Sequence, residues 1–251
     1  NTYSAYLQDS FKAADNLRLY LGARLDYVDI PNTAAQYTNP NVAALTFYQP
    51  DGSAMKVDTG TMPKGQLYVS PRFGFNWDVK GDKTTQIRGG SGIFLSRLPY
   101  VLISNQLGNN GVNIGRIGVN DTSAYPFTID PSVYTPNSTV AAKGFNVNYT
   151  DPNLKMPQVW KTSLAVDHKF DILGGIIGTI EGIYNKNINA LYYYDANLKP
   201  TTSTFNGGDN RPSYWYGSNN ASNTPRYNPS NVTGNPAAVY VLSNTKEGSF
   251  Y

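Results

Sequence analysis

The stretch that decides the fold is Leu17-Arg18-Leu19-Tyr20-Leu21-Gly22-Ala23-Arg24-Leu25-Asp26-Tyr27. Every second residue is apolar or aromatic, and the residues between them include two arginines, an aspartate and a glycine. Successive side chains of a β-strand point to opposite faces, so a period of two predicts a strand with one apolar and one polar face.

Alternating runs recur along the chain and pair into three predicted hairpins. The predicted strands are 3–12 with 17–27, 66–79 with 84–95, and 158–169 with 176–198, and a seventh starts near 239–242. Short segments join each pair, such as 13–16, where Asp and Asn suit a tight turn because they tolerate left-handed conformations. The pattern predicts an antiparallel sheet of consecutive hairpins.

Long connections separate the hairpins. They cover about 28–65, 97–156 and 199–237 and are rich in Asn, Pro, Gly, Ser and Thr. Structureless links of this length are unusual in compact domains, where most run about 4 to 6 residues. Short turns at one end and long loops at the other are typical of outer-membrane barrels, so we expect the long loops on the extracellular side.

Composition excludes several kinds of chemistry. The 251 residues contain no cysteine and one histidine, His168, which excludes disulfides, thiol catalysis and multi-histidine metal sites. The net charge is +3 and the basic residues form no runs, which argues against a nucleic-acid partner. No apolar run reaches the roughly 18 residues of a membrane helix, but a barrel strand shows lipid only one face, so a mean hydropathy of -0.42 is compatible with a barrel.

Alternation alone does not separate a membrane barrel from a soluble β-sandwich. The predicted strands match the roughly 9 to 11 residues that cross a bilayer and exceed the mode of about 5 to 6 in globular proteins. Opposed charges on the polar faces suit a wet lumen, and tyrosine and tryptophan gather at strand ends, where they meet lipid headgroups. We therefore expect an all-β fold, a transmembrane antiparallel β-barrel.

The alternation also assigns the two faces of the wall. The residues expected to face the lumen are Arg18, Arg24, Asp26, Arg72, Asp78, Arg88 and Glu181. The residues expected to face lipid are Leu19, Leu21, Leu25, Phe73, Phe75, Trp77, Ile87 and Ile93. The lumenal arginines either pair with neighbouring carboxylates, which is the simpler interpretation, or contact a substrate.

No segment carries an active-site signature. Gly89-Gly90-Ser91-Gly92 lacks the Gly-Lys-Ser/Thr continuation and the helix of a phosphate-binding loop, so it is interpreted as strand. The strand carboxylates stand singly, and His168 has no serine and aspartate pattern beside it. We expect no catalytic residue, no cofactor and no metal, and we do not expect an enzyme.

The connection 97–156 contains amide side chains followed by aromatic ones. Asn105, Gln106, Asn109 and Asn110 precede the segment Tyr125-Pro126-Phe127. Amides and aromatics in one loop suit a grip on a polar ligand or a brace against a plug domain. The alternative is a loop that only folds over the barrel mouth.

Seven segments carry strand motifs in a fixed order: Tyr6 to Lys12, Leu19 to Tyr27, Ser70 to Asp78, Ile87 to Phe94, Pro157 to Lys161, Glu181 to Lys186 and Leu242 to Gly248. These segments resemble successive barrel strands of TonB-dependent receptors. Their order and spacing resemble in particular the Oar-like branch, whose members usually carry an amino-terminal carboxypeptidase-regulatory-like domain.

The resemblance implies a barrel of about 22 strands closed around a plug, of which this chain supplies about seven. It implies that the plug and the amino-terminal domains lie outside this chain, and that a missing amino-terminal segment engages the TonB complex. The implied partners are outer-membrane lipid, the protein's own plug domain, the TonB complex and other outer-membrane subunits. The expected location is the outer membrane of a Gram-negative bacterium.

Energised uptake of a ligand such as an oligosaccharide, a peptide or a metal chelate is the leading functional hypothesis. Its rivals are a passive porin or structural component of a larger outer-membrane complex, and a secreted carbohydrate-binding β-protein. A plug and TonB box encoded upstream separate the first two, and a need for detergent extraction excludes the third.

Overall fold

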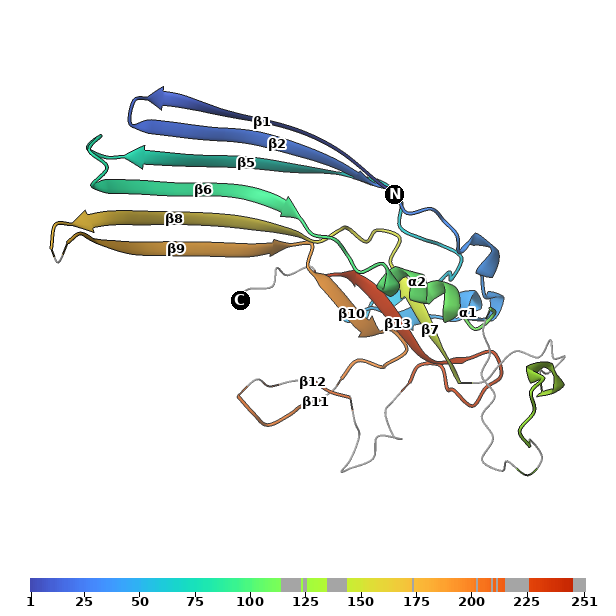
Figure 1. Cartoon of the computed structure of the whole chain (residues 1–251). Helices are drawn as coiled ribbons and strands as arrows, with labels where there is room; N and C mark the ends of the chain where they lie inside the picture. Colours follow the sequence, from blue (N-terminus) through green and yellow to red (C-terminus); the bar gives the residue numbers. More distant parts are fainter. Residues whose placement is uncertain are drawn as a thin grey trace.

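Six long strands form one antiparallel sheet, here called the wall, in the order β1–β2–β5–β6–β8–β9 (Figure 1). Their bounds are β1 (Thr2–Ala14), β2 (Leu17–Val28), β5 (Gln66–Asp78), β6 (Thr85–Leu95), β8 (Gln158–Phe170) and β9 (Ile176–Ile188). The computed structural model describes residues 1–113, 123, 126–134, 144–172, 174–201, 203–208, 210, 212–214 and 226–245.

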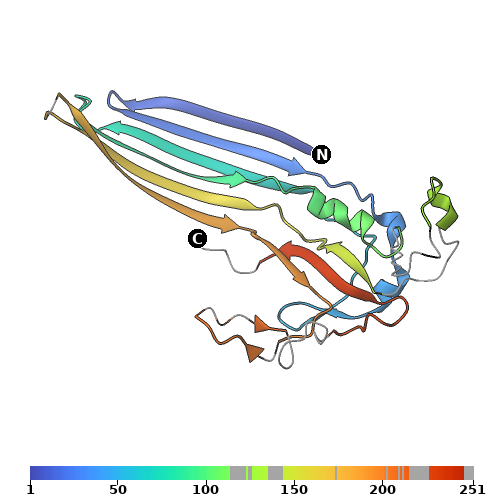
Figure 2. The ribbon, with the colours of Figure 1, turned by 60° about the horizontal axis from the view of Figure 1, so that its bottom comes forward.

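The three predicted hairpins are confirmed, since β1 pairs with β2, β5 with β6 and β8 with β9. Their short turns gather at one end of the wall (Figures 1 and 2). In the turn after β5, the Asp78 carboxylate accepts hydrogen bonds from the backbone N–H groups of Gly81 and Lys83, at 3.0 and 2.9 Å. Both of these residues have positive φ, so the turn needs the left-handed region that glycine adopts without strain.

The long connections fold at the opposite end of the wall into a structure here called the cap. The cap comprises the described residues of 29–65, 96–157 and 189–245. Its helices are η1 (Ala35–Tyr37), α1 (Pro40–Ala44), α2 (Val101–Gly108) and η2 (Pro131–Tyr134). Its strands are β3 (Phe47–Tyr48), β4 (Ala54–Met55), β7 (Phe145–Thr150), β10 (Leu191–Asp195), β11 (Ser203–Thr204), β12 (Pro212–Ser213) and β13 (Pro236–Asn244). Of the helices described, none is both long enough and apolar enough to cross a bilayer.

The buried apolar residues lie almost entirely in the cap. One cluster includes Ile103, Leu154 and Leu242, and the other includes Phe47 and Val239. Among the described residues, the wall strands contribute only three buried hydrophobic side chains, those of Val28, Tyr68 and Ala165. The connections are thus a packed unit with its own core, whereas the wall has none.

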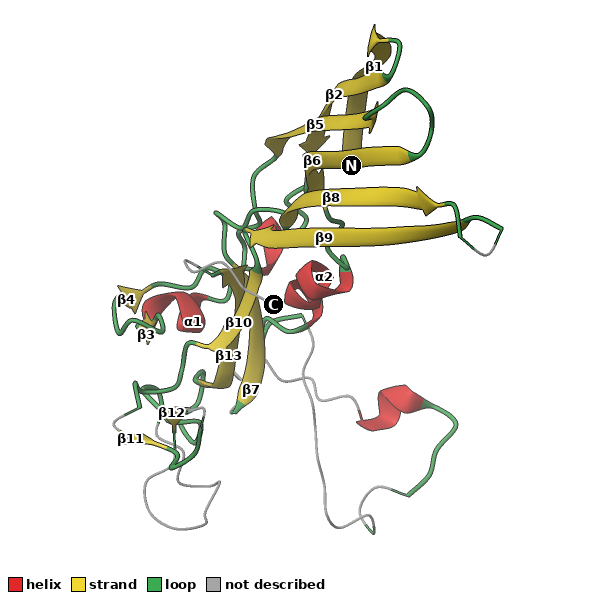
Figure 3. Cartoon of the chain, turned by 90° about the vertical axis from the view of Figure 1, so that its left-hand side faces the viewer, coloured by secondary structure: helices red, strands yellow, loops and turns green. Residues whose placement is uncertain are grey.

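Two strand predictions need correction. The predicted strand 176–198 ends at Ile188, where Asn189 adopts a left-handed φ of 54° and redirects the chain into β10. The predicted strand near 239–242 exists as β13, but it pairs with β10 and, in parallel, with β7. Side chains on both faces of β13 are buried, which suits the centre of a covered sheet better than a wall strand with one exposed face. Figure 3 shows this three-stranded sheet beside the end of the wall.

Candidate functional site

One face of the wall, here called the apolar face, is covered by large hydrophobic side chains. Directly paired residues of antiparallel strands share a face, and the register places all eight residues predicted to face lipid on this one. Its exposed large side chains are Tyr3, Leu7, Phe11, Leu21, Leu25, Tyr27, Leu67, Val69, Phe73, Trp77, Trp160, Leu164, Val166, Phe170, Ile176, Ile180 and Tyr184.

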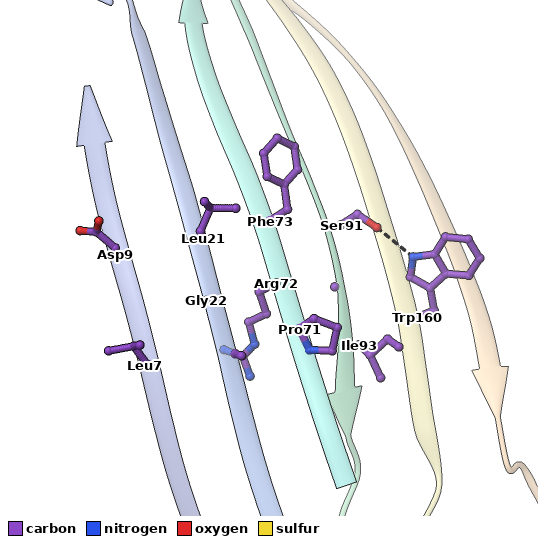
Figure 4. Close-up of a pocket in the computed structure, with 12 residues that line it drawn as sticks. Leu7, Asp9, Leu21, Gly22, Pro71, Arg72, Phe73, Ser91, Ile93 and Trp160 are labelled. Carbon is purple, nitrogen blue, oxygen red and sulfur yellow. Dashed lines mark hydrogen bonds between the residues drawn. The ribbon is translucent and has the colours of Figure 1, made fainter. Parts of the chain in front are cut away.

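A hollow of about 840 Å³ lies on the apolar face, where small residues such as Ala23 and Pro71 separate larger ones. Figure 4 shows the side chains that surround it, among them Leu7, Leu21, Phe73, Ile93 and Trp160.

Several polar groups on the apolar face are joined by hydrogen bonds. The Trp160 indole donates to Ser91 Oγ at 2.8 Å (Figure 4), and Ser91 Oγ lies 2.8 Å from Thr162 Oγ1. His168 Nδ1 lies 2.8 Å from Thr85 Oγ1. Asp9 of the edge strand β1 has only a local partner among the described residues, since its carboxylate accepts the N–H of Ser10.

The opposite side of the wall, here called the polar face, gathers the residues predicted to face the lumen. The register places all seven of them there, from four different strands. Asp78 is bound in its turn, as described above. Of the remaining six, Arg24, Asp26, Arg88 and Glu181 take part in ion pairs, and Arg72 lies over the Phe94 ring.

Ion pairs occupy the part of the polar face near the short turns. Arg88 Nε lies 3.0 Å from Asp167 Oδ2, and Arg88 Nη1 lies 3.9 Å from Glu181 Oε1. The Thr179 hydroxyl donates to the other oxygen of Asp167 at 2.7 Å. Arg88 thus pairs with two neighbouring carboxylates, in line with the simpler of the two interpretations.

A second ion pair lies near the cap. Arg24 Nε is 3.0 and 2.9 Å from the two Asp26 oxygens, and Ser4 Oγ donates to Asp26 at 2.5 Å. The Asp26 side chain is almost fully buried. A buried carboxylate needs such partners, because removing a charge from water is otherwise very unfavourable.

Between the two ion pairs the polar face is hollow. Glycines stand opposite larger residues across the strands, as in the pairs Gly22 with Arg72 and Gly74 with Tyr20. The hollow measures about 610 Å³ and is lined by both polar and apolar side chains, including Lys161 and Asn185. It is open to solvent and has the size of a small-molecule site, which is about 300 to 1,000 Å³.

The amide cluster of 105–110 does not form an exposed binding surface. Gln106 is fully buried; its amide nitrogen donates to the carbonyls of Thr59 and Thr61, and its oxygen accepts the N–H of Thr150. Asn110 is also fully buried and accepts the N–H groups of Val112 and Asn113. A ligand or plug contact is therefore wrong for these two residues, because their hydrogen bonds hold the cap together.

Asn105 is partly buried and Asn109 is exposed. The segment Tyr125-Pro126-Phe127, which was predicted to act with the amides, lies partly outside the described residues. Tyr192, Tyr193 and Tyr194 lie in β10 of the cap.

Three residues on or near the polar face were not among the predicted site residues: Ser70, Lys161 and Arg97. The period of two on β5 and β8 places Ser70 and Lys161 on the polar face, so the signal was present. Arg97 follows the end of β6 and had no periodic signal.

The apolar face is too extensive for the wall to be exposed to water. Soluble monomers rarely expose contiguous apolar patches beyond about 300 to 600 Å², whereas this apolar face extends across all six strands. Strands of 11 to 13 residues are long enough to cross a bilayer. The edge strands β1 and β9 each have one paired neighbour among the described residues, so the sheet is an arc of a barrel.

Searches among curated proteins and among solved structures each gave no match. A family model described as "Outer membrane beta barrel domain" matches residues 1–241, which include all six wall strands and most of the cap. The chain therefore belongs to this family of outer-membrane β-barrel domains and resides in the outer membrane of a Gram-negative bacterium.

Proposed function

We propose that this chain forms part of the wall and cap of a TonB-dependent transporter of the Oar-like branch, which imports a ligand with energy supplied from the inner membrane. The apolar face contacts lipid and the polar face lines the lumen. The short turns lie on the periplasmic side and the cap on the extracellular side.

The observation that carries this proposal is the polar face. It combines ion pairs from β2, β6, β8 and β9 with a hollow of ligand size. Charged side chains across a wall fit a hydrated interior better than a protein core. The motif resemblance of the wall strands to TonB-dependent receptors supplies the energy-coupling part of the proposal.

The unpaired edges of the wall support a barrel with more strands than these six. The hydrocarbon of a bilayer offers no hydrogen-bond partner to the backbone N–H and C=O groups of a strand edge. In the membrane, β1 and β9 therefore each require a further neighbouring strand. We propose that the remaining strands, the plug domain and the TonB-binding segment belong to the same polypeptide.

Planar-bilayer conductance of the full-length protein tests this function without knowledge of the ligand. A plugged transporter is expected to be nearly silent and to conduct once its plug is deleted. A persistent open conductance of the intact protein would instead support a passive porin.

Energy coupling is tested by pull-down with the purified periplasmic domain of TonB. We expect binding that is lost when the amino-terminal TonB box of the full-length protein is deleted. A gene that encodes neither a plug nor a box would overturn the proposal and favour a structural role.

A further inference from the structure

The hydroxyl of Ser70 is buried without a partner. Ser70 lies on the polar face of β5, opposite Arg24 of β2, and its side chain is 1% exposed. No described residue forms a hydrogen bond with Ser70 Oγ. Buried polar groups in native proteins nearly always have a partner, so an unpaired hydroxyl points to a missing ligand or water.

Ser70 lines a small cavity at the seam between the wall and the cap. The cavity holds about 180 Å³ and is bordered by Arg24, Asp26, Arg72, Phe94 and Arg97. A water molecule occupies about 30 Å³ of liquid volume, so the space suits a group of several heavy atoms, such as a phosphate or a carboxylate. Its lining includes residues 94–98, where β6 ends and the chain continues toward α2.

The cavity carries an excess of positive charge. Three arginines line it, and Asp26 is the one acidic residue among its described lining residues. Asp26 is engaged by Arg24 through contacts of 2.9 to 3.0 Å. No described carboxylate forms an ion pair with Arg72 or Arg97, so two guanidinium groups remain available to an anion.

Arg72 is held in position before any ligand arrives. Its guanidinium carbon lies 4.7 Å from the centre of the Phe94 ring. Gly92 makes room for this stack, because a Cβ there would lie 3.2 Å from Arg72 Cγ and 3.3 Å from Phe94 Cε2. A guanidinium stacked on an aromatic face keeps its N–H edges free to bind an anion.

We propose that this cavity binds the anionic group of a small ligand, a phosphate or a carboxylate. Arg72 and Arg97 supply the charge, and the Ser70 hydroxyl donates a hydrogen bond to the anion. The site deepens the proposed transport function, since the anionic group belongs to the imported molecule. Binding itself requires no energy coupling and can be measured alone.

Equilibrium dialysis of the purified full-length protein in detergent tests the site, with inorganic phosphate and acetate as separate probes. We expect saturable binding of at least one probe, weakened about tenfold or more by Arg97→Ala, because a charge-assisted hydrogen bond is lost. The matched control is Arg18→Ala, which removes the same charge from the polar face outside the cavity.

Ser70→Ala separates a binding role from a structural one. This variant is expected to weaken probe binding several-fold while leaving the resistance of the barrel to heat unchanged or raised, because it removes an unpaired buried hydroxyl. Absence of saturable binding of either probe, or equal losses in the Arg97 and Arg18 variants, would overturn the site. Saturable probe binding by a full-length protein that does not bind the periplasmic domain of TonB would keep the site and overturn the transport proposal alone.

Discussion

Arg88 and Asp167 are joined across the pair β6–β8 by a hydrogen bond of 3.0 Å between Arg88 Nε and Asp167 Oδ2. The two residues occupy diagonal positions of the register, where long side chains of neighbouring strands reach each other. Their side chains are 44% and 20% exposed, so solvent screens the attraction. The ion pair therefore fixes the orientation of these two side chains more than it contributes to the stability of the wall.

Asp167→Asn is therefore expected to lower the free energy of unfolding only slightly at low salt, and by less at high salt. The measurement is urea unfolding of the full-length protein in lipid vesicles, followed by tryptophan fluorescence. A double-mutant cycle with Arg88→Gln isolates the pair. A loss that does not change with salt would contradict a screened ion pair.

Leu164 and Ser163 are neighbours on β8 that lie on opposite faces of the wall. Leu164, in the middle of the strand, is 53% exposed on the apolar face. Leu164→Arg is expected to cost about 2 to 4 kcal/mol, because the charge meets hydrocarbon, whereas Ser163→Arg escapes that penalty. The stability of both variants is measured as the temperature at which the folded barrel loses its characteristic gel mobility. Equal losses in the two variants would contradict the assignment of Leu164 to the lipid-facing side.

Gly89 and Gly182 flank Leu164 in one row of the register, yet their surroundings differ. A Cβ at Gly89 would lie 2.9 Å from Ser163 O, a backbone atom that cannot easily move, whereas at Gly182 the nearest atom is 4.0 Å away. Gly89→Ala is expected to cost about 1 to 3 kcal/mol through overpacking. Gly182→Ala is the control and should be neutral or slightly stabilising in the same urea unfolding assay.

The same row shows why the wall was predictable from sequence. A period of two fixes the face of every residue in a strand, and short turns fix which strands are neighbours. Leu19 and Phe75 were assigned to one face from separate runs, and the register pairs them directly. Local patterns sufficed for the faces and for the three hairpins, although the pairs β2–β5 and β6–β8 join strands that the long connections separate.

The cap was not predictable, because its contacts join distant segments. β13 pairs in parallel with β7, and Gln106 contacts Thr59 and Thr150, which lie 47 and 44 residues away. An amide side chain looks the same in sequence whether it binds a ligand or satisfies backbone groups. Ser70 was missed for a related reason, since only the folded seam shows that its hydroxyl lacks a partner.

Gln106→Leu is expected to loosen the cap while sparing the wall. The change leaves the carbonyls of Thr59 and Thr61 and the N–H of Thr150 without a partner, at a cost of at least about 2 kcal/mol. Hydrogen exchange of peptides from 144–157 should accelerate, whereas peptides from β8 should not change. Asn109→Ala, at an exposed position of the same segment, is the control; if it matched Gln106→Leu, the structural role of the buried amide would be refuted.

Alkaline pH is expected to open the cap before it affects the wall. Burial raises the pKa of the Tyr149 hydroxyl and of the Tyr194 hydroxyl above the ordinary value of 10.0. Because the folded pKa exceeds the unfolded one, the folded cap keeps its full stability below about pH 10 and loses it as the pH rises toward the folded pKa. Exchange of cap peptides, corrected for the intrinsic pH dependence, should therefore increase as the pH rises above about 10. The double variant Tyr149→Phe with Tyr194→Phe removes both ionisable hydroxyls and should shift this opening to higher pH; an unchanged profile would mean that other groups control the alkaline transition.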